Sequence, residues 1–348
     1  MSAVRISIAM ATYNGERHIR EQLESLSSQI HLPWELQIGD DGSSDGTLSI
    51  IEFFSKSAPF PVKLHRNSKT LGYAQNFIQT ARRCAGDWVA FCDQDDVWMP
   101  NKLMRCAELV SASNEDTHLV VHAVAIVDDD LRPTGQSFPP KPRSETHAPL
   151  TRPLFWSHQG SSQLVRMDLL TDLDHSVRAP TVFTNVDPYP HDSWFALLGN
   201  VLGKSVELDE PLGLYRRHRY SVSQAGKQRN EFGVRELLST GAEHYRHMEE
   251  VSQKTARCLR HQCNHVTNPL WRERLIRASN RFELLAKAYD HRANVYAQRR
   301  LGKRASHLFK LIVGPGYFGL GPSSFGVRSF CKDLVFCIFH SNRRRPYS

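Results

Sequence analysis

Short apolar runs alternate with helical patterns over the first hundred residues, and this alternation constrains the fold more than any other feature. The apolar runs are Ile6–Ala11, Trp34–Gly39, Pro61–Leu64 and Trp88–Phe91. The helical patterns are Glu16–Gln29, Thr47–Lys56, Tyr73–Cys84 and Pro100–Ser113. Strands alternating with helices of this length predict a parallel sheet with helices on both faces. Ligands of such sheets bind beyond the carboxyl ends of the strands, so the residues after each run are candidates for a site.

Three carboxylates follow the fourth apolar run within four residues. They are Asp93, Asp95 and Asp96, with Gln94 between the first two. Mutual repulsion makes such a cluster costly unless a cation or a positively charged ligand neutralises it. Oxygen ligands of this kind suit Mg²⁺ or Mn²⁺, and a metal held by one or two carboxylates keeps positions open for a diphosphate. An isolated D-x-D pair is more often a solvated turn, so the other strand ends decide between the two interpretations.

Polar motifs also follow the earlier strands. In chain order the motifs are T-Y-N (Thr12–Asn14), D-D-G-S-S-D-G (Asp40–Gly46), N-x4-G-x3-N (Asn67, Gly72 and Asn76) and D-Q-D-D-V-W (Asp93–Trp98). This set resembles the family 2 glycosyltransferases of the GT-A fold. The last motif and the later H-D-S-W (His191–Trp194) resemble the rhamnosyltransferase-like branch of that family. The resemblance implies an α/β fold, a Rossmann-like mixed sheet flanked by helices, over roughly residues 4 to 220.

The resemblance also implies which residues bind the donor, a dTDP- or UDP-sugar. The implied nucleotide-sugar-binding residues are Thr12, Tyr13, Asn14, Glu16, Asp40, Asp41, Asn76, Asp93 and Gln94. The loop after the first strand holds the base and ribose. Either Asp40 or Asp41 accepts a hydrogen bond from the pyrimidine ring, and we favour Asp41. Relatives often carry a cation at position 75 for the diphosphate; this chain has Gln75, so Arg66 or Lys69 is the alternative.

For the metal, Mg²⁺ or Mn²⁺, the resemblance implies Asp95 as a ligand and Asp93 beside the ribose or the metal. His218, in the segment Tyr215–His218, is a further candidate for the metal or the diphosphate, and Arg216 or Arg217 for the phosphate charge. A basic surface loop is an equally good interpretation of that segment. Trp98 is expected in the core or in a pocket wall.

Asp192 is the general base that the resemblance implies. An inverting transfer needs one carboxylate to deprotonate the acceptor hydroxyl as that oxygen attacks the anomeric carbon. It needs no nucleophilic carboxylate, in contrast to retaining hydrolysis. From the residues alone, Asp192 is also a good cap for an ordinary helix. The small-residue segment Gln159–Ser162 corresponds to the acceptor side.

Positive charge is concentrated in the last third of the chain. Of 348 residues with net charge +8, residues 227–348 hold 23 Lys and Arg against 9 Asp and Glu. We therefore predict a catalytic domain over 1–226 and a basic, mainly helical region over 227–348. Its apolar residues recur at helical spacing, which predicts either packing on the catalytic domain or attachment to an anionic membrane surface through Phe330, Phe336 and Phe339. No nucleic-acid-binding module is recognisable, so nucleic acid is not an expected partner.

The remaining features bear on location. No apolar stretch is long enough for a transmembrane helix, and the N-terminus lacks a signal-peptide pattern. The seven cysteines are scattered, which favours free thiols in a reducing cytosol. We expect a cytoplasmic protein, peripheral on the inner face of the cell membrane. Residues 133–153, rich in Pro, Ser and Thr, predict an exposed loop.

Three functions compete on this basis. The first is a metal-dependent inverting glycosyltransferase that acts on a growing surface polysaccharide or a lipid-linked glycan, with rhamnose as one candidate sugar. The second is a nucleotidyltransferase of similar sheet architecture, but Thr12–Gly15 is not the Gly-rich basic loop expected there. The third is a non-catalytic membrane-associated scaffold, which loss of the D-x-D motif or of Asp192 would favour. Both features are present, so the sequence favours activity.

Overall fold

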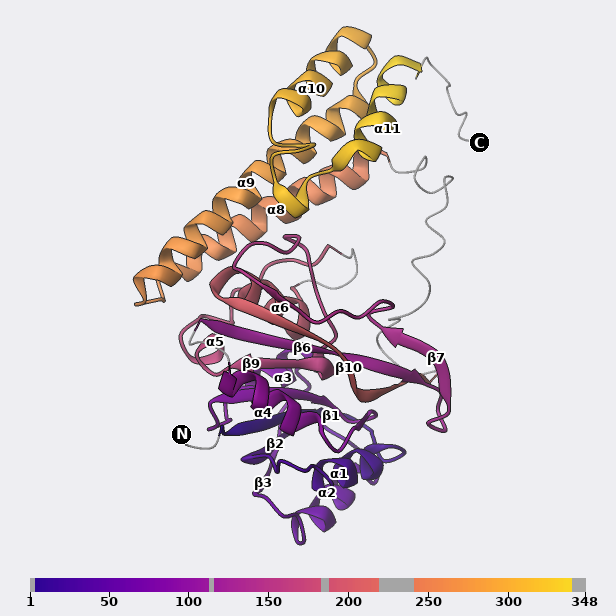
Figure 1. Cartoon of the computed structure of the whole chain (residues 1–348), viewed down its shortest axis with the longest axis vertical. Coiled ribbons are helices and arrows are strands. Elements are labelled where there is room, and N and C mark those ends of the chain that lie inside the picture. Colours follow the sequence, from indigo (N-terminus) through magenta and orange to yellow (C-terminus); the bar gives the residue numbers. More distant parts are fainter. Residues whose placement is uncertain (1–3, 113–115, 183–187, 219–240, 340–348) are drawn as a thin grey trace. The chain divides into compact units, whose positions relative to one another are not determined.

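The computed structural model describes residues 4–112, 116–182, 188–218 and 241–339 (Figure 1). The chain divides into two compact units. Unit 1 comprises residues 1–149, 156–175 and 189–227, and unit 2 comprises residues 150–155, 176–188 and 228–348. Unit 2 thus takes two short segments from the part of the chain before residue 226, where the sequence analysis drew its boundary.

Unit 1 is built on a mixed sheet of ten strands within the described residues. They are β1 (Ile6–Thr12), β2 (Glu35–Asp40), β3 (Val62–Arg66), β4 (Trp88–Asp93), β5 (Val97–Trp98), β6 (Thr117–Val127), β7 (Pro133–Phe138), β8 (Glu145–His147), β9 (Gln163–Arg166) and β10 (Lys204–Arg216). The order is β3-β2-β1-β4-β9-β6-β10-β5, with β7 on β6 and β8 on β10. Strands β3, β2, β1 and β4 are parallel, whereas β9 is antiparallel to both of its neighbours. The expected mixed α/β fold is confirmed.

Helices cover both faces of this sheet. In unit 1 they are α1 (Ile19–Ser27), α2 (Thr47–Ser55), α3 (Tyr73–Ala81), α4 (Lys102–Ala112), α5 (Asp168–Thr171) and α6 (His191–Leu202), with a 3-10 turn at Gly160–Ser162. On one face, alternate residues of β1 such as Ile8 pack in one core with Leu23 of α1. On the other, Phe91 of β4 contacts Phe77 of α3 and Phe195 of α6. The two-sided cover predicted from the alternating pattern is confirmed.

The expected loop over residues 133–153 is wrong in part, because β7 and β8 form within it. Most side chains of these two strands are exposed. They join the sheet through their backbones, β7 on β6 and β8 on β10. An edge strand without buried side chains leaves no apolar alternation in the sequence, so the pattern gave no signal.

Unit 2 is helical, as its periodicity predicts. Its long helices are α8 (Ala242–Gln262), α9 (Pro269–Ala297), α10 (Leu301–Val313) and α11 (Gly326–Phe339), with a 3-10 turn at Gly321–Ser323. Helices α8 and α9 pack along each other. The side chain of Asn268 accepts hydrogen bonds from the backbone N–H groups of Leu270 and Trp271, which caps α9 ahead of Pro269.

A second core closes unit 2 around the ends of α9, α10 and α11. It contains the buried residues Leu308, Leu311, Tyr317 and Cys337, with Phe330, Leu334 and Phe336 packed against them. Among the described helices, none is both long enough and apolar enough to cross a membrane.

Candidate functional site

The carboxyl ends of β1, β2 and β4 meet at one edge of the unit 1 sheet, which we call the site edge. The parallel register places Thr12 beside Asp40 and Ala11 beside Asp93. Polar residues that stand far apart in the sequence therefore leave neighbouring strands side by side.

Asp40 is buried and fixes the turn after β2. Its Oδ2 accepts a hydrogen bond from Thr12 Oγ1 at 3.0 Å. Its Oδ1 accepts the backbone N–H groups of Gly42 at 3.1 Å and Ser43 at 2.9 Å. Gly42 has a φ of 93°, a backbone conformation that favours glycine. Asp40 and Thr12 thus shape the site edge, and a contact of either with a donor stays a prediction.

Asp41 is only 4% exposed and anchors the loop between β3 and α3. Its Oδ1 accepts hydrogen bonds from the backbone N–H of Leu71 at 2.7 Å and from Asn67 Nδ2 at 3.1 Å. Its Oδ2 accepts the N–H of Gly72 at 2.8 Å. A carboxylate oxygen has two lone pairs, so Oδ2 keeps one acceptor position beyond these bonds. The predicted bond from a pyrimidine N–H to Asp41 is therefore chemically open and stays a prediction.

Asn76 is buried and ties α3 to the end of β2. Its Nδ2 donates to the carbonyl oxygen of Gly39 at 2.7 Å, and its Oδ1 accepts from Asn67 Nδ2 at 3.0 Å. Both ends of the amide are thus engaged within the protein. Arg66, one candidate for the diphosphate, pairs with Glu52 at 2.7 Å. Donor contacts of these two residues stay predictions.

Gln94 clamps the loop after β1 to the loop after β4. Its Oε1 accepts the backbone N–H of Tyr13, and its Nε2 donates to the carbonyl oxygen of Tyr13, both at 3.0 Å. A Cβ at Gly15 would lie 2.3 Å from Gln94 Oε1, so only glycine fits beside the clamp. Tyr13 is 55% exposed at the site edge. The hydrogen bonds to Gln94 hold its backbone and do not involve its ring.

Asn14 and Glu16 join the loops after β1 and β2. The N–H of Asn14 donates to Ser43 Oγ at 3.0 Å, and Asn14 Oδ1 accepts the N–H of Ser44 at 2.9 Å. A carboxylate oxygen of Glu16 accepts the N–H of Gly46. Asn14 has a φ of 47°, which a short polar side chain tolerates. The two loops therefore form one connected rim.

The acid cluster after β4 resists ionisation. Burial, followed by the negative charges of Asp95 and Asp192, raises the pKa of Asp93 to about 7. Burial, followed by the negative charges of Asp95 and Asp93, raises the pKa of Asp96 well above its usual value. Asp96 Oδ1 accepts the backbone N–H of Arg216 at 3.0 Å, so this carboxyl group joins the loop after β4 to the end of β10. A bound cation would relieve this repulsion and favour the charged carboxylates.

Lys102 is a buried cation beside this cluster that the sequence analysis missed. Its Nζ donates to the carbonyl oxygen of Ser161 at 2.6 Å and lies 3.4 Å from the centre of the Trp98 ring. Trp98 is buried, as expected. Burial lowers the pKa of Lys102 to about 8, although the nearby acids favour its charge. The sequence did offer one indication that this lysine is buried: Lys102 precedes Leu103 and lies on the apolar side of the predicted helix.

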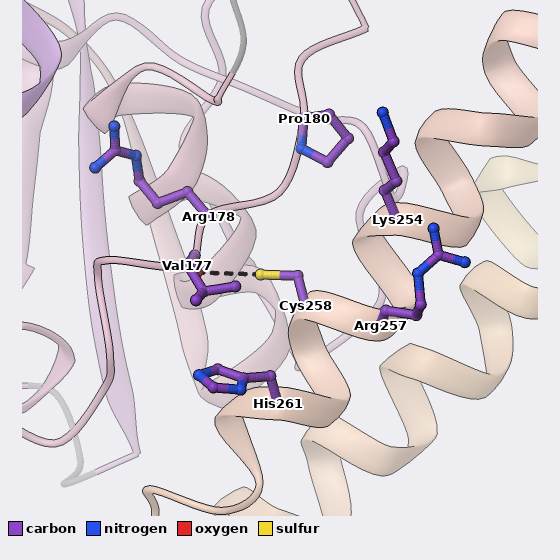
Figure 2. Close-up of a pocket in the computed structure, with 7 residues that line it drawn as sticks. All are labelled: Val177, Arg178, Pro180, Lys254, Arg257, Cys258 and His261. Atoms are coloured by element: carbon purple, nitrogen blue, oxygen red, sulfur yellow. Dashed lines mark hydrogen bonds between the residues drawn. The ribbon is translucent and has the colours of Figure 1, made fainter.

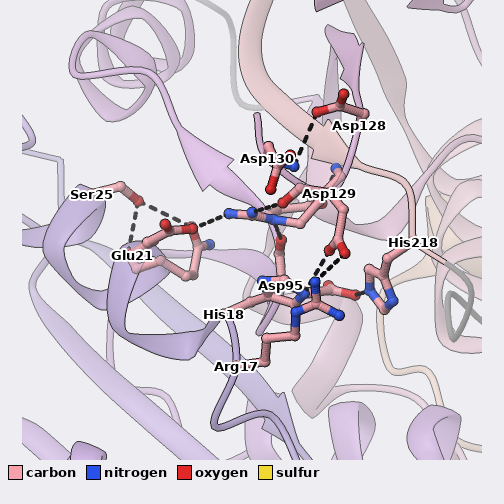
Figure 3. A network of polar contacts seen from close by, with 12 residues as sticks. Arg17, His18, Glu21, Ser25, Asp95, Asp128, Asp129, Asp130 and His218 are labelled. Carbon is pink, nitrogen blue, oxygen red and sulfur yellow. Dashed lines mark hydrogen bonds and ion pairs between the residues drawn. The ribbon is translucent and has the colours of Figure 1, made fainter. Parts of the chain in front are cut away.

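His218 meets Asp95 at the site edge, where Figure 3 shows the surrounding polar network. Its Nε2 lies 2.8 Å from Asp95 Oδ2. Arg216 is 2% exposed. Its guanidinium donates hydrogen bonds to the carbonyl oxygens of Asp95 at 2.8 Å and Asp129 at 2.5 Å. It also forms an ion pair with Glu21. Arg216 therefore has a structural role, because its guanidinium links three segments around the site. Of the two arginines, Arg217 stays the candidate for neutralising the charge of the diphosphate.

A second acid and a second histidine adjoin this pair, and the sequence analysis named neither. Asp129 Oδ1 lies 3.1 Å from Nε2 of His18, and Asp129 also pairs with Arg17 (Figure 3). The ring of His18 lies 5.1 Å from that of His218, centre to centre. The run of three acids at residues 128–130, directly after the apolar β6, was a signal of the same kind as the cluster after β4.

Asp192 lies in the first turn of α6, and its carboxyl group is near the acid cluster. Burial raises its pKa to about 6, although the N–H of Ser193 donates to Asp192 Oδ1 at 2.6 Å. The charges of Asp192 and Asp93 both raise the pKa of Tyr73, after burial, so these three groups share one region. No side-chain cap is formed at the start of α6, so the alternative of Asp192 as a helix cap is wrong.

Packing fixes the segment that carries Asp192. The ring of His191 stacks on Phe77 at 4.0 Å and contacts Phe91 at 4.9 Å, centre to centre. Gly160 closes the other side, because a Cβ there would lie 2.6 Å from His191 Nε2 and 3.5 Å from Asp192 Cβ. The predicted acceptor segment Gln159–Ser162 is thus packed directly against the start of α6.

The donor set fits a hard divalent cation. Two carboxylates and an imidazole, Asp93, Asp95 and His218, lie at the site edge, and the raised pKa of Asp93 marks charge that a cation would neutralise. In the described part of the chain, the three do not come within 4.8 Å of one another as a group; Asp95 and His218 alone are in contact.

A separate pocket of about 470 Å³ lies within unit 2 (Figure 2). It is lined by Val177, Arg178, Pro180, Lys254, Arg257, Cys258 and His261. The thiol of Cys258 donates to the carbonyl oxygen of Val177 at 3.2 Å. None of the lining residues is a carboxylate, so the pocket offers neither a general base of that kind nor an oxygen-rich metal site. The carboxylates that could serve these purposes lie at the site edge.

Comparison with known proteins gives the family. Residues 7–173 match the model of Glycosyl transferase family 2. An uncharacterised glycosyltransferase of Nostoc is 33% identical over 135 residues, which are 38% of this chain and 41% of the relative. A dTDP-rhamnosyl transferase of Shigella flexneri is 34% identical over 113 residues, 31% of this chain and 39% of the relative.

A third relative, an Escherichia coli UDP-Glc:alpha-D-GlcNAc-diphosphoundecaprenol beta-1,3-glucosyltransferase, is 37% identical over 28% of this chain and 38% of its own. The matches thus span well under two thirds of these relatives. Among solved structures, Staphylococcus aureus TarS 1-349 in complex with UDP-GlcNAc is similar, with a TM-score of 0.52 and 18% identity. That similarity covers 88% of this chain and 85% of TarS 1-349, and it supports the fold.

Proposed function

Residues 7–173 belong to glycosyltransferase family 2, and from that premise we propose an inverting, metal-dependent transfer of a sugar from a nucleotide-sugar donor to an acceptor hydroxyl. The observation that carries the proposal is the common location of three features: the half-buried Asp192, the acid cluster after β4 and the loops of the site edge. A transfer of this kind needs a base, a charged site for the diphosphate and a holder for the nucleoside in one place.

In the proposed reaction, the Asp192 carboxylate takes the proton of the acceptor hydroxyl. The freed oxygen attacks the anomeric carbon on the face opposite the diphosphate, and the bond from that carbon to the diphosphate oxygen breaks. One displacement inverts the anomeric configuration, and the nucleoside diphosphate leaves. A pKa of about 6 suits the base, because Asp192 is then mostly ionised at neutral pH yet more basic than an ordinary carboxylate.

The protein's own groups prepare this step. Asp93, Asp95 and His218 would hold Mg²⁺ or Mn²⁺, which when bound supplies positive charge to the departing diphosphate. The Gln94 clamp and the Asp40 turn set the rim for the nucleoside, with Asp41 as the proposed acceptor for the pyrimidine N–H.

The donor and acceptor classes are proposed from the relatives. The names of two relatives point to dTDP-rhamnose and UDP-glucose as their donors. We therefore propose a pyrimidine nucleotide sugar as the donor of this chain, with rhamnose as one candidate for the transferred sugar. The lipid diphosphate in one relative's name favours a lipid-linked glycan or growing polysaccharide as acceptor. The seven cysteines are unpaired, as is usual in a reducing compartment, and we therefore propose that the reaction takes place on the cytoplasmic side of the cell membrane.

A donor panel tests this proposal. The purified chain is incubated with UDP-, dTDP- and GDP-sugars and Mg²⁺ or Mn²⁺, and release of nucleoside diphosphate is measured with and without EDTA. We expect slow release from one pyrimidine donor, lost with EDTA. Release of a sugar 1-phosphate, by transfer of the nucleoside monophosphate group, would instead favour a nucleotidyltransferase. No release from any donor at any metal concentration would contradict the proposal.

A further inference from the structure

Helix α10 has an apolar side that nothing in the described chain covers. Leu301, Phe309, Ile312 and Val313 are 55%, 62%, 44% and 66% exposed. At 3.6 residues per turn these positions fall on one side of the helix. The buried residues Leu308 and Leu311 adjoin this side and pack in the unit 2 core. The apolar surface of the helix is therefore wider than the part that packs in the core.

Helix α11 repeats this arrangement. Val327, Val335 and Ile338 are 62%, 56% and 53% exposed, and Cys331, at the same helical spacing, is exposed too. Cys337 on the other side is buried in the core. Phe318, in the segment between the two helices, is 62% exposed. Exposed apolar side chains are common singly, but two helical stripes and an exposed Phe in forty residues mark an interaction surface.

The charges that α10, α11 and the residues flanking them carry are mostly positive. Residues 299–339 carry the cationic residues Arg299, Arg300, Lys303, Arg304, Lys310, Arg328 and Lys332. The only acid among them is Asp333, which is fully buried and paired with Arg292 at 2.8 Å. Residues 299–339 thus present apolar side chains and positive charge, although Arg304 is buried. Asp290 of α9, whose side chain is 40% exposed, adds a negative charge close enough to affect His307 of α10.

We propose that the exposed stripes of α10 and α11, together with Phe318, bind an anionic lipid surface. We call this set the lipid face. Apolar side chains flanked by Lys and Arg are the composition of helices that lie in a membrane interface, and an anionic leaflet complements the charge. Binding to lipid would bring the enzyme to a lipid-linked acceptor, and in this respect the inference rests on the proposed function. Vesicle binding itself does not depend on that function.

The lipid face replaces the residues expected from sequence. The sequence left two alternatives for Phe330 and Phe336, packing or insertion into lipid, and both pack against the buried residues of the unit 2 core. The side chain of Phe339 lies outside the described residues. Membrane attachment through the first two would require opening the core, whereas the lipid face is exposed in the folded state.

Cosedimentation of the full chain with vesicles tests the proposal. We expect binding to vesicles that contain anionic phosphatidylglycerol, weak binding to neutral phosphatidylcholine vesicles, and loss of binding at high salt. Phe309→Gln with Ile312→Gln should lower partitioning by about tenfold or more, because two large apolar side chains are no longer buried in lipid. Lys303→Gln with Lys310→Gln should lower it by about tenfold at low salt.

A matched control is available on α9, where Leu284 is 40% exposed and Lys287 is exposed. Leu284→Gln with Lys287→Gln should leave vesicle binding unchanged, and circular dichroism should be the same for all variants. Failure of the wild-type chain to bind strongly anionic vesicles at low salt would overturn the proposal. The proposal would also be overturned if the wild-type chain were a dimer that the Phe309 variant alone dissociates, because the lipid face would then bind a second copy of the chain. Vesicle binding requires no turnover, so its loss and a failure of the donor panel are separate results.

Discussion

Asp333 is predicted to be the residue on which the helical core of unit 2 depends most. It is 0% exposed, and its Oδ2 lies 2.8 Å from Arg292 Nε. It also accepts hydrogen bonds from the hydroxyl groups of Tyr296 at 2.6 Å and Tyr317 at 2.8 Å. Through these contacts one carboxylate joins α11 to α9 and to the segment that follows α10.

Asp333→Asn keeps the size of the side chain but removes its charge. The guanidinium of Arg292, whose side chain is 8% exposed, would remain buried without its counter-charge. Breaking a buried ion pair from one side costs about 3–5 kcal/mol, much of which is the cost of the stranded charge. We expect the free energy of unfolding of the helical unit to fall by about that amount.

The matched control is Glu283→Gln, which removes an exposed ion pair with Arg260 on the same helix α9. Both of these side chains are 50% exposed, so the loss should stay below about 1 kcal/mol. Urea unfolding followed by circular dichroism, with hydrogen exchange of α9 and α11 peptides, separates this unit from the sheet. An Asp333→Asn protein within about 1 kcal/mol of the wild type would refute the reasoning, because the pair would then contribute no more than a surface pair.

Three further predictions concern the site edge. Since burial raises the pKa of Asp192 to about 6, the base is protonated below that pH; we expect kcat/KM to fall as the pH drops through about 6, and a flat profile down to pH 5 would count against Asp192. Asp95→Ala should abolish the enhancement of nucleoside-diphosphate binding by Mn²⁺ in calorimetry, and an unchanged enhancement would exclude Asp95 as a ligand. Gly160→Ala puts a Cβ 2.6 Å from His191 Nε2, so turnover should drop by about 10²-fold as α6 shifts, whereas Gly302→Ala, with open space around it, should be neutral.

The sequence predicted the part of the fold that follows from local pattern. The four apolar runs became β1 to β4. Strands β1, β2 and β4 are buried almost throughout and therefore read as continuous apolar runs, whereas β3 at the end of the sheet is only partly buried. The position of the site followed from this, since parallel strands present their carboxyl ends at one edge. The family 2 resemblance is confirmed by the match over residues 7–173.

The sequence could not predict features that depend on partners distant in the chain. Arg216 looked like a phosphate ligand, yet its neighbours Asp95, Asp129 and Glu21 engage it inside the protein. Phe330 has the same amphipathic spacing whether it meets lipid or the unit 2 core, so periodicity alone could not decide between them. Lys102 stands on the apolar side of the predicted helix, but the carbonyl oxygen of Ser161 that accepts its hydrogen bond lies far away in the sequence.

Turnover of Asp192→Asn tests the central claim most directly. The substitution keeps the size of the side chain and removes the proton acceptor, while Asp172→Asn changes an exposed carboxylate at the end of α5 as a control. With the donor found in the panel, the account predicts that sugar transfer by Asp192→Asn falls by about 10²-fold or more. Donor affinity and the control should be unchanged. Near-normal transfer by Asp192→Asn would contradict the account, because the base would then be elsewhere.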